Sequence, residues 1–349
     1  RPVSVEQLVG SGVGGGLHEV VWRPLKAGGG GVAGVVGGVF EVPVLVGVDP
    51  VVGVRSVLGG VLEEVQGWLE GDEAGPLVVV TRGAVSVGGD SGVDVCGAPV
   101  WGLVRAAQAE NPGRFVLVDV DPVGGSFADV ADVVVGSGEP EVAVRGGEVL
   151  VPRLVEVVVG EAGDGVVAEV VPGGTVLVTG GTGGLGGLVA RHLVERYGVR
   201  RLVLAGRRGV EAPGVGELCA VLRGLGAEVR VVACDMADRS AVAGLVEGLG
   251  AGLVGVVHAA GAGDNGLVGS MDGARLDRAL GAKADGAWYL HELTRELDLA
   301  LFVLFSSAGG SVLAAGQANY AAANVFLDAL AVQRRAEGLP ATSLAYGLW

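Results

Sequence analysis

The sequence predicts an α/β protein made of two doubly wound units of similar size. Short runs rich in valine and leucine alternate with helical patterns over the whole chain, as in parallel sheets whose crossovers are helices. The runs are apolar almost throughout, which is typical of strands buried on both faces. This pattern occurs on both sides of a glycine-rich segment, Gly160–Gly174. We place the boundary there and predict units of residues 1–169 and 170–349, each near the usual domain size.

The individual elements follow from these runs. In the first unit we predict strands at Val44–Val48, Leu77–Thr81 and Phe115–Val120 and helices at Ser56–Trp68 and Val100–Ala109. In the second unit, the predicted strands are Thr175–Thr179, Arg201–Ala205, Glu228–Cys234, Leu253–His258, Leu299–Phe305 and Thr342–Tyr346. Helical patterns in that unit include Leu188–Tyr197, Ala274–Leu297 and Asn319–Leu330.

The composition is apolar, with a mean hydropathy of +0.56. Two uncharged stretches, Val170–Ala190 and Leu299–Leu327, are long enough to span a membrane, but both are interrupted by glycine and polar residues. A spanning helix needs about 20 predominantly apolar residues, so we expect no membrane segment. Three cysteines without CxxC spacing and the lack of a signal segment lead us to expect a cytoplasmic protein. Because it begins at Arg1 without methionine, we expect a piece of a longer chain.

The charge excludes one class of partner. The chain has 24 basic and 39 acidic residues and a formal net charge of −15. Such a chain has no basic surface for a phosphate backbone, and we expect no nucleic acid partner. The four histidines show no metal-ligand spacing, so no metal site is expected.

Glycine accounts for 67 of the 349 residues, so a GxGxxG pattern carries little information by itself. About two matches are expected by chance at this abundance, and five occur, starting at Gly10, Gly29, Gly181, Gly250 and Gly261. Only the match at Gly181 directly follows a predicted strand and opens a helix. That context would place backbone N–H groups at a pyrophosphate, although a plain glycine turn is the alternative. The predicted dinucleotide loop consists of Thr179, Gly180, Gly181, Thr182, Gly183, Gly184, Leu185 and Gly186.

The end of the next strand indicates which dinucleotide binds. An NAD site carries an acidic residue there for the ribose 2′-hydroxyl, whereas this chain has Arg207 and Arg208. An arginine can bind a 2′-phosphate with two hydrogen bonds, which favours NADP(H) over NAD(H). A solvated charge pair at a strand end is the alternative. Asp235, at the end of the third strand, could accept a hydrogen bond from the adenine amino group.

Four polar residues are candidates for proton chemistry. Tyr320 and Asn324 are four residues apart on one helix face, and Ser307 ends the strand before that helix. A tyrosine is a poor acid near neutrality unless a nearby ammonium stabilises its phenolate. Lys283, one of two lysines in the chain, is the candidate for that ammonium. Taken singly, each of the four could equally be a cap, a core-edge residue or a solvated side chain.

Together these motifs resemble the short-chain dehydrogenase/reductase superfamily and, more narrowly, the ketoreductase domain of a modular type I polyketide synthase. Most of the superfamily carries its lysine four residues after the tyrosine. Here Asn324 occupies that position and the lysine lies upstream at Lys283, an exchange typical of these ketoreductases. The resemblance extends over the chain through the segments Leu17–Trp22, Ala98–Arg105, Asn111–Phe115, Val151–Leu154, Val257–Gly261 and Tyr346–Trp349.

The resemblance implies two Rossmann-like subdomains. Residues 1–169 would form a truncated structural subdomain without cofactor, and residues 170–349 a catalytic subdomain that binds NADPH. Trp349 precedes the helix and lid with which the family continues, so we expect a truncated lid. The resemblance also assigns to the cofactor Met236, Ala259, Ala260 and Gly261.

The implied reaction is reduction of a β-ketoacyl thioester on an acyl carrier protein, within a polypeptide that has neighbouring domains. Ser307 and Tyr320 would hold the carbonyl oxygen, and Tyr320 would donate the proton. Lys283 would stabilise the phenolate and orient the ribose, while Asn324 would hold a water that relays the proton.

The family's markers of product configuration are not intact. B-type members carry Leu-Asp-Asp shortly after Ala-Ala-Gly, where this chain has Gly-Asp-Asn, and A-type members carry a tryptophan eight residues before the tyrosine, where it has valine. Because the tryptophan is absent and the first aspartate is retained, we expect the B-type product. The candidate stereocontrol residues are Asp264, Asn265, Val312 and Gln317.

Two other functions remain open. A non-reducing relative would bind the carrier and epimerise the α-carbon or only act as a scaffold, but such relatives lose the tyrosine, the asparagine or the glycine motif. A nucleotide-sugar epimerase or free-standing dehydrogenase is disfavoured by Asn324 in place of the expected lysine. Titration with NADPH, with and without a β-ketoacyl-thioester mimic, distinguishes the three.

Overall fold

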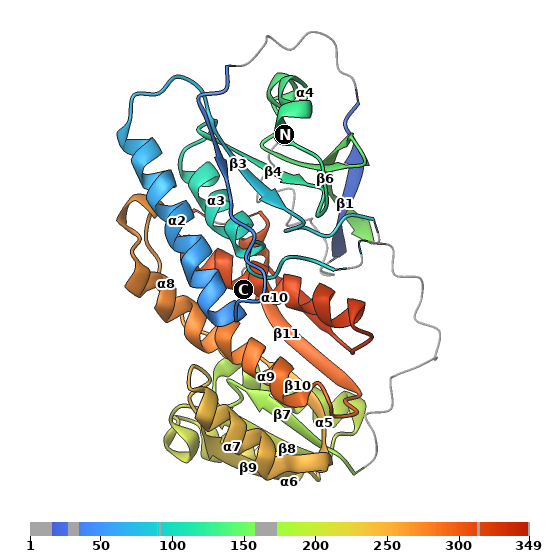
Figure 1. Cartoon of the computed structure of the whole chain (residues 1–349). Helices are drawn as coiled ribbons and strands as arrows, with labels where there is room; N and C mark the ends of the chain where they lie inside the picture. Colours follow the sequence, from blue (N-terminus) through green and yellow to red (C-terminus); the bar gives the residue numbers. More distant parts are fainter. Residues whose placement is uncertain are drawn as a thin grey trace.

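The computed structural model describes residues 16–26, 35–88, 90, 92–157, 173–312 and 315–347. They form two six-stranded sheets with helices around them, which confirms the predicted fold class (Figure 1). The expected boundary segment Gly160–Gly174 lies outside the described residues except for its last two. The division at residue 169/170 therefore stays a prediction.

The first sheet has the order β1-β6-β5-β4-β3-β2. Strands β2 to β5 are parallel, whereas β6 is antiparallel to both of its neighbours, β5 and β1. The strands are β1 (Leu17–Pro24), β2 (Gly38–Glu41), β3 (Leu77–Arg82), β4 (Phe115–Val120), β5 (Glu141–Arg145) and β6 (Glu148–Val157). The helices of this half are α2 (Pro50–Glu70), α3 (Pro99–Glu110) and the short α4 (Ala131–Ser137).

One predicted strand of this half is wrong. Val44–Val48 is not a strand, and the sheet is instead completed by β2, which ends at Glu41. The backbone N–H of Val42 still bonds to the Val80 oxygen, but beyond Pro43 the chain leaves the sheet. Gly47 has a left-handed φ of +71° and Val46 is 89% exposed, and neither fits a buried strand. The pair β5 and β6 and helix α4 were not predicted. By contrast, the family-like opening segment Leu17–Trp22 does form a strand, β1.

The second sheet is parallel throughout, in the order β12-β11-β10-β7-β8-β9. This is the doubly wound order in which the chain reverses direction across the sheet between β7 and β10, the point where such sheets bind ligands. All six predicted strands occur here with bounds shifted by two residues at most: β7 (Thr175–Thr179), β8 (Arg201–Gly206), β9 (Glu228–Ala233), β10 (Leu253–His258), β11 (Leu301–Ser307) and β12 (Thr342–Tyr346).

The helices of the second half confirm two predicted patterns and divide a third. Helices α5 (Gly184–Tyr197) and α10 (Ala318–Ala336) cover the predicted stretches, and α6 (Val215–Gly224) and α7 (Arg239–Leu249) are additional. The predicted helix Ala274–Leu297 consists of α8 (Gly273–Leu280), a π-helical turn (Gly281–Asp285) and α9 (Gly286–Thr294).

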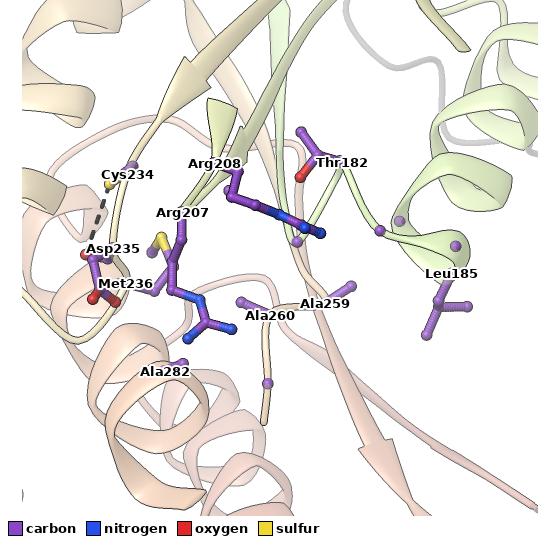
Figure 2. A pocket seen from close by; sticks show the side chains of 16 residues that line it. Thr182, Leu185, Arg207, Arg208, Cys234, Asp235, Met236, Ala259, Ala260 and Ala282 are labelled. Atoms are coloured by element: carbon purple, nitrogen blue, oxygen red, sulfur yellow. Dashed lines mark hydrogen bonds between the residues drawn. The ribbon is translucent and has the colours of Figure 1, made fainter. Parts of the chain in front are cut away.

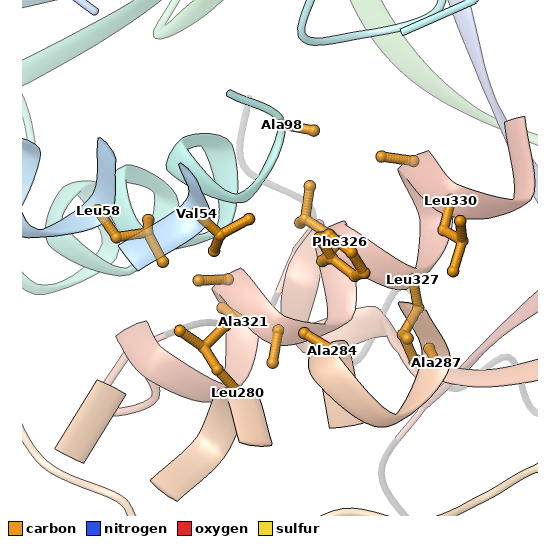
Figure 3. Packing of buried hydrophobic residues seen from close by; sticks show 14 of the residues in the cluster. Val54, Leu58, Ala98, Leu280, Ala284, Ala287, Ala321, Phe326, Leu327 and Leu330 are labelled. Carbon is orange, nitrogen blue, oxygen red and sulfur yellow. The ribbon is translucent and has the colours of Figure 1, made fainter. Parts of the chain in front are cut away.

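The two halves share one hydrophobic core. Helices α2 and α3 lie against α8 and α10 in the middle of the molecule (Figure 1), and their buried residues belong to one cluster. Val54 and Leu58 from α2 lie beside Ala321, Phe326 and Leu280 of the second half in Figure 3. At the closest point, a Cβ on Gly102 of α3 would overlap the backbone of Ala321, so only glycine allows the two helices to approach this far.

Neither a membrane-spanning helix nor a cluster of metal ligands occurs in the ranges that the structure describes. No helix there is both long and apolar enough to cross a membrane. No three histidine, cysteine or acidic side chains gather there in a way that could hold a metal ion.

Candidate active site

The glycine loop lies at the carboxyl end of β7, at the switch point of the second sheet. Gly180 has a left-handed φ of +65°, and a Cβ there would lie 2.7 Å from the carbonyl oxygen of Ala259. A Cβ on Gly186 would overlap the carbonyl oxygen of Gly180. The loop therefore closes tightly over the start of α5, whose N-terminal N–H groups stay free to bind an anion.

A cavity of about 730 Å³ opens beside this loop. Most of the predicted cofactor residues line it: Gly180, Thr182, Gly183, Gly184, Leu185, Gly186, Arg207, Arg208, Asp235, Met236, Ala259, Ala260 and Gly261. Thr179 and Gly181 are not among the lining residues. Three further lining residues, Gly206, Cys234 and Ala282, were missed, although the first two end or follow neighbouring strands and could have been found by that rule.

The two arginines of the cavity are exposed at the end of β8. Figure 2 shows both side chains projecting beside the cavity, with that of Arg208 extending toward Thr182. Neither forms a salt bridge or side-chain hydrogen bond within the described residues. Two guanidinium groups at this strand end can bind a phosphate with paired hydrogen bonds.

A second cavity, of about 420 Å³, adjoins the first and shares Leu185, Ala259 and Gly261 with it. Ser307, at the end of β11, and Tyr320, in the first turn of α10, both line it. Lys283 reaches it from the π-helical turn. Three separate elements thus bring a hydroxyl, a phenol and an amine to one cavity.

Lys283 is nearly buried, with 5% of its surface exposed. Its Nζ donates to the carbonyl oxygen of Phe305 at 2.8 Å and lies 5.2 Å from the centre of the Tyr320 ring. Burial lowers the pKa of Lys283 to about 8, against the opposing effect of Asp328. At neutral pH the side chain therefore remains mostly cationic beside the phenol.

Asn324 is fully buried one turn after Tyr320 and does not line the cavity. Its Nδ2 donates to the backbone oxygen of Tyr320 at 2.8 Å. Its Oδ1 is buried and has no hydrogen-bond partner within the described residues. A buried acceptor of this kind usually bonds to an ordered water.

A buried histidine connects the glycine loop to the lysine. His258, at the end of β10, has Nδ1 2.8 Å from Thr179 Oγ1 and Nε2 2.8 Å from the carbonyl oxygen of Lys283. Burial lowers the pKa of His258 to about 4, so its ring is neutral. Since a carbonyl can only accept, Nε2 carries the proton and the threonine hydroxyl donates to Nδ1.

The four candidate stereocontrol residues divide into two pairs. Asn265 and Gln317 line the second cavity. Asp264 and Val312 do not: the Asp264 carboxylate bonds to Arg275 at 2.8 Å and to Arg278, and Val312 is 40% exposed. The roles of all four remain predictions.

The first half also contacts the segments around this site. Arg55 of α2 binds both oxygens of Asp285, two residues after Lys283, at 2.9 and 2.7 Å. Gln66 of α2 donates to the backbone oxygens of Val268 and Met271. Glu110, at the end of α3, accepts hydrogen bonds from two loops of the second half. None of these contacts could be predicted from the sequence, because their partners are remote in sequence.

The model of the KR domain family matches residues 174–349. The chain belongs to the ketoreductase domain family of polyketide synthases. A second model, the Rossmann fold domain of the polyketide synthase extender module SpnB, matches residues 13–154. The resemblance found in the sequence is confirmed, and as a ketoreductase domain the chain is an oxidoreductase that acts on a β-keto group.

Named relatives agree with this assignment. The chain is 55% identical over 315 residues to the polyketide synthase GfsA of Streptomyces halstedii and 48% identical over 359 residues to GfsE of the same organism. The matches cover 88% and 100% of this chain, but it spans only 4% and 9% of the length of those relatives.

Solved structures match over almost the whole chain. A structure described as an A1-type ketoreductase is 34% identical with a TM-score of 0.79, and the match covers 95% of this chain and 82% of that one. The ketoreductase from the first module of phoslactomycin biosynthesis in Streptomyces sp. HK803 is 35% identical, also with a TM-score of 0.79, covering 96% and 82%. A C2-type ketoreductase of a modular polyketide synthase is 31% identical with a TM-score of 0.77, covering 95% and 84%.

Proposed function

We propose that this chain reduces a β-ketoacyl thioester, carried on an acyl carrier protein, to the β-hydroxyacyl thioester with NADPH as the reductant. The observation that carries the proposal is the junction of the two cavities. The first is formed around the glycine loop, and the second presents Ser307, Tyr320 and Lys283 next to it. A reductant and a carbonyl bound in the two cavities would meet beside Ala259 and Gly261.

The residues of the first cavity fit a phosphorylated dinucleotide. The glycine loop leaves room that a Cβ would fill, and the α5 N-terminus suits a pyrophosphate. Arg207 and Arg208 suit a 2′-phosphate, which is why NADPH is proposed rather than NADH. When bound, NADPH supplies a hydride for the β-carbon of the substrate.

The chain's own residues would handle the oxygen and the proton. The Ser307 and Tyr320 hydroxyls hydrogen-bond the carbonyl oxygen, where negative charge develops during reduction. Tyr320 donates its proton to that oxygen as general acid. The Lys283 ammonium, 5.2 Å from the ring centre, stabilises the phenolate that remains. The unpartnered Oδ1 of Asn324 holds a water through which the proton is replaced.

The carrier protein is proposed because the relatives are much longer, multidomain proteins. The relatives are polyketide synthases more than ten times the length of this chain. We propose that the chain acts beside other domains of one polypeptide, on a substrate tethered to a carrier protein of that polypeptide.

The decisive experiment is Tyr320→Phe, assayed by NADPH oxidation with a β-ketoacyl-thioester mimic. Removing the acid should lower turnover by at least about 100-fold, while the dissociation constant for NADPH, measured by fluorescence titration, stays within twofold of wild type. Unchanged turnover would contradict the assignment. NADPH binding without oxidation by the wild-type protein would favour an epimerase or a scaffold.

We further propose the B-type configuration for the alcohol. Support comes from Val312 in place of the A-type tryptophan and from Asp264 at the position of the B-type aspartate. Chiral chromatography of the product measures the configuration, and an A-type alcohol would contradict this part of the proposal.

A further inference from the structure

Glu110 is the last residue of α3 in the first half, yet both of its carboxylate oxygens bond to the second half. Oε2 accepts the N–H of Val268 at 2.7 Å, and Oε1 accepts the N–H of Gly316 at 2.9 Å. These partners are 158 and 206 residues away in sequence. Glu110 forms no salt bridge within the described residues, and these two amides are the hydrogen-bond donors to its carboxylate there. Bonds from N–H groups to an ionised carboxylate are stronger than those to a neutral acceptor.

The two amides belong to the loops that border the second cavity. Val268 follows the loop that carries Asn265, and Gly316 precedes Gln317, the N-cap residue of α10. Asn265 and Gln317 both line the cavity. The loops also bond to each other, because Gly266 donates to the Gly316 oxygen at 2.8 Å and pairs with Gln317 in a parallel bridge. Glu110 thus binds both sides of one wall of the substrate cavity.

Helix α3 provides a fixed support for this contact. Its Gly102 lies directly against Ala321 of α10, the neighbour of Tyr320. Its Arg105 bonds to Glu141 at 3.0 and 2.7 Å within the first half and to the Gly310 oxygen at 2.9 Å in the second. The end of α3 is therefore held in place independently of Glu110.

We propose that Glu110 is a positioning residue that fixes the wall formed by Asn265 and Gln317, and so sets how the β-ketoacyl group lies against Tyr320. The first half, to which neither the dinucleotide loop nor a catalytic residue is assigned, would thereby contribute to substrate fit and product configuration. The inference rests on the proposed function for its substrate but not for its geometry.

The test variant is Glu110→Gln. A glutamine has one acceptor oxygen, and its amide nitrogen would face an N–H group, so one bond is lost and a donor meets a donor. KM for the thioester mimic should rise about tenfold with a smaller change in kcat, and the minor alcohol isomer should increase. The NADPH dissociation constant should stay within twofold of wild type.

A readout without turnover keeps the test independent of activity. Hydrogen exchange measured by mass spectrometry should become faster in peptides that contain Val268 and Gly316, and stay unchanged in those from β7 and α5. If Glu110→Gln folds poorly, Glu110→Asp replaces it as the test variant. An aspartate side chain is too short to reach both amides, so exchange should change in the same direction but by less.

Asp121→Asn is the matched control. Asp121 also binds a backbone amide, that of Gly146 at 3.0 Å, but both residues lie in the first half. This variant should leave KM, isomer ratio and loop exchange at wild-type values. Unchanged loop exchange in Glu110→Gln, or an equal loss of NADPH affinity, would overturn the inference. A wild-type protein that never oxidises NADPH, with faster loop exchange in Glu110→Gln, would instead refute the proposed function alone.

Discussion

Each half is a six-stranded sheet with helices around it, but the first sheet is mixed, the second is wholly parallel, and their carboxyl ends differ. In the first sheet, side chains fill the carboxyl end: Asp119 is fully buried and accepts hydrogen bonds from Thr81, the Ala84 amide and Arg145. Trp101 covers this group by donating to Thr81 at 3.0 Å. In the second sheet, the equivalent edge carries the glycine loop and opens into the two cavities. A six-stranded α/β unit thus serves as support in one half and carries the candidate site in the other, and the residues at the strand ends make this difference.

The first half supports segments of the second half that lie around the candidate site. Arg55 of α2 and Glu110 of α3 bind segments next to Lys283 and Gln317, and Gln66 of α2 binds the backbone of Val268. These polar contacts lie around a shared apolar core. The first half therefore holds the segments that carry the proposed catalytic side chains, and changes in it should be measurable as changes in catalysis.

The largest effect is expected for Gly102→Ala, which lies outside the half that carries the proposed catalytic residues. The added Cβ would overlap the backbone of Ala321, so α3 and α10 must separate. Overpacking against backbone should lower the free energy of unfolding by about 3 kcal/mol. Because Tyr320 precedes Ala321, turnover should also fall by more than about tenfold. Urea unfolding and NADPH oxidation measure the two effects.

This outcome would confirm that the halves act as one unit. If Gly102→Ala loses stability but retains full turnover, the contact between α3 and α10 is structural only. If neither changes, the close approach of the two helices is not required.

The sequence was sufficient where local chemistry determines the structure. Buried parallel strands need continuous apolar runs, so all six strands of the second half were found, and a strand followed by glycines located the loop at Gly181. The strand at Val44–Val48 was wrong because an apolar run cannot show that its Gly47 adopts a left-handed φ, which no strand has. In the first half, β5 and β6 were missed.

Contacts between distant segments could not be predicted in the same way. Nothing near Glu110 distinguishes it from a solvated helix end, since its partners come from loops of the other half. The π-helical turn at Lys283 was also missed, although Gly281 begins it and Gly286 follows it. Gly286 is needed there because a Cβ would lie 3.2 Å from His258 Cε1 and 3.0 Å from the Met236 oxygen.

The second-largest effect concerns stability at acid pH, which should depend on His258 in the second half. His258 has a pKa of about 4 when folded and an ordinary value of 6.5 when unfolded. Between these values the unfolded chain binds more protons, so this contribution is complete above pH 6.5 and is lost as the pH falls toward 4. From pH 7 to pH 5 it should remove about 2 kcal/mol from the free energy of unfolding.

His258→Gln tests this, because glutamine does not titrate. Urea unfolding at pH 7 and pH 5 should show a fall that is about 2 kcal/mol smaller in the variant than in wild type. His291, whose pKa burial also lowers to about 4, titrates in both proteins and serves as an internal reference. An equal fall in both proteins would mean that His258 is not a neutral, buried group.

The smallest effect is expected for Gly60→Ala, which should stabilise the protein. Compared with Gly102→Ala, it distinguishes glycines that the structure requires from those that only reflect composition. Gly60 lies on the exposed side of α2, and a Cβ there would meet nothing within 4 Å. Gly60→Ala should therefore raise the free energy of unfolding by about 0.7 kcal/mol, because alanine loses less backbone entropy in a helix, and should leave turnover unchanged. It is the matched control for Gly102→Ala, since both exchange glycine for alanine within a helix of the first half. A loss of turnover in Gly60→Ala would show that catalysis responds to any change in this half, and the specific role given to the contact between α3 and α10 would fail.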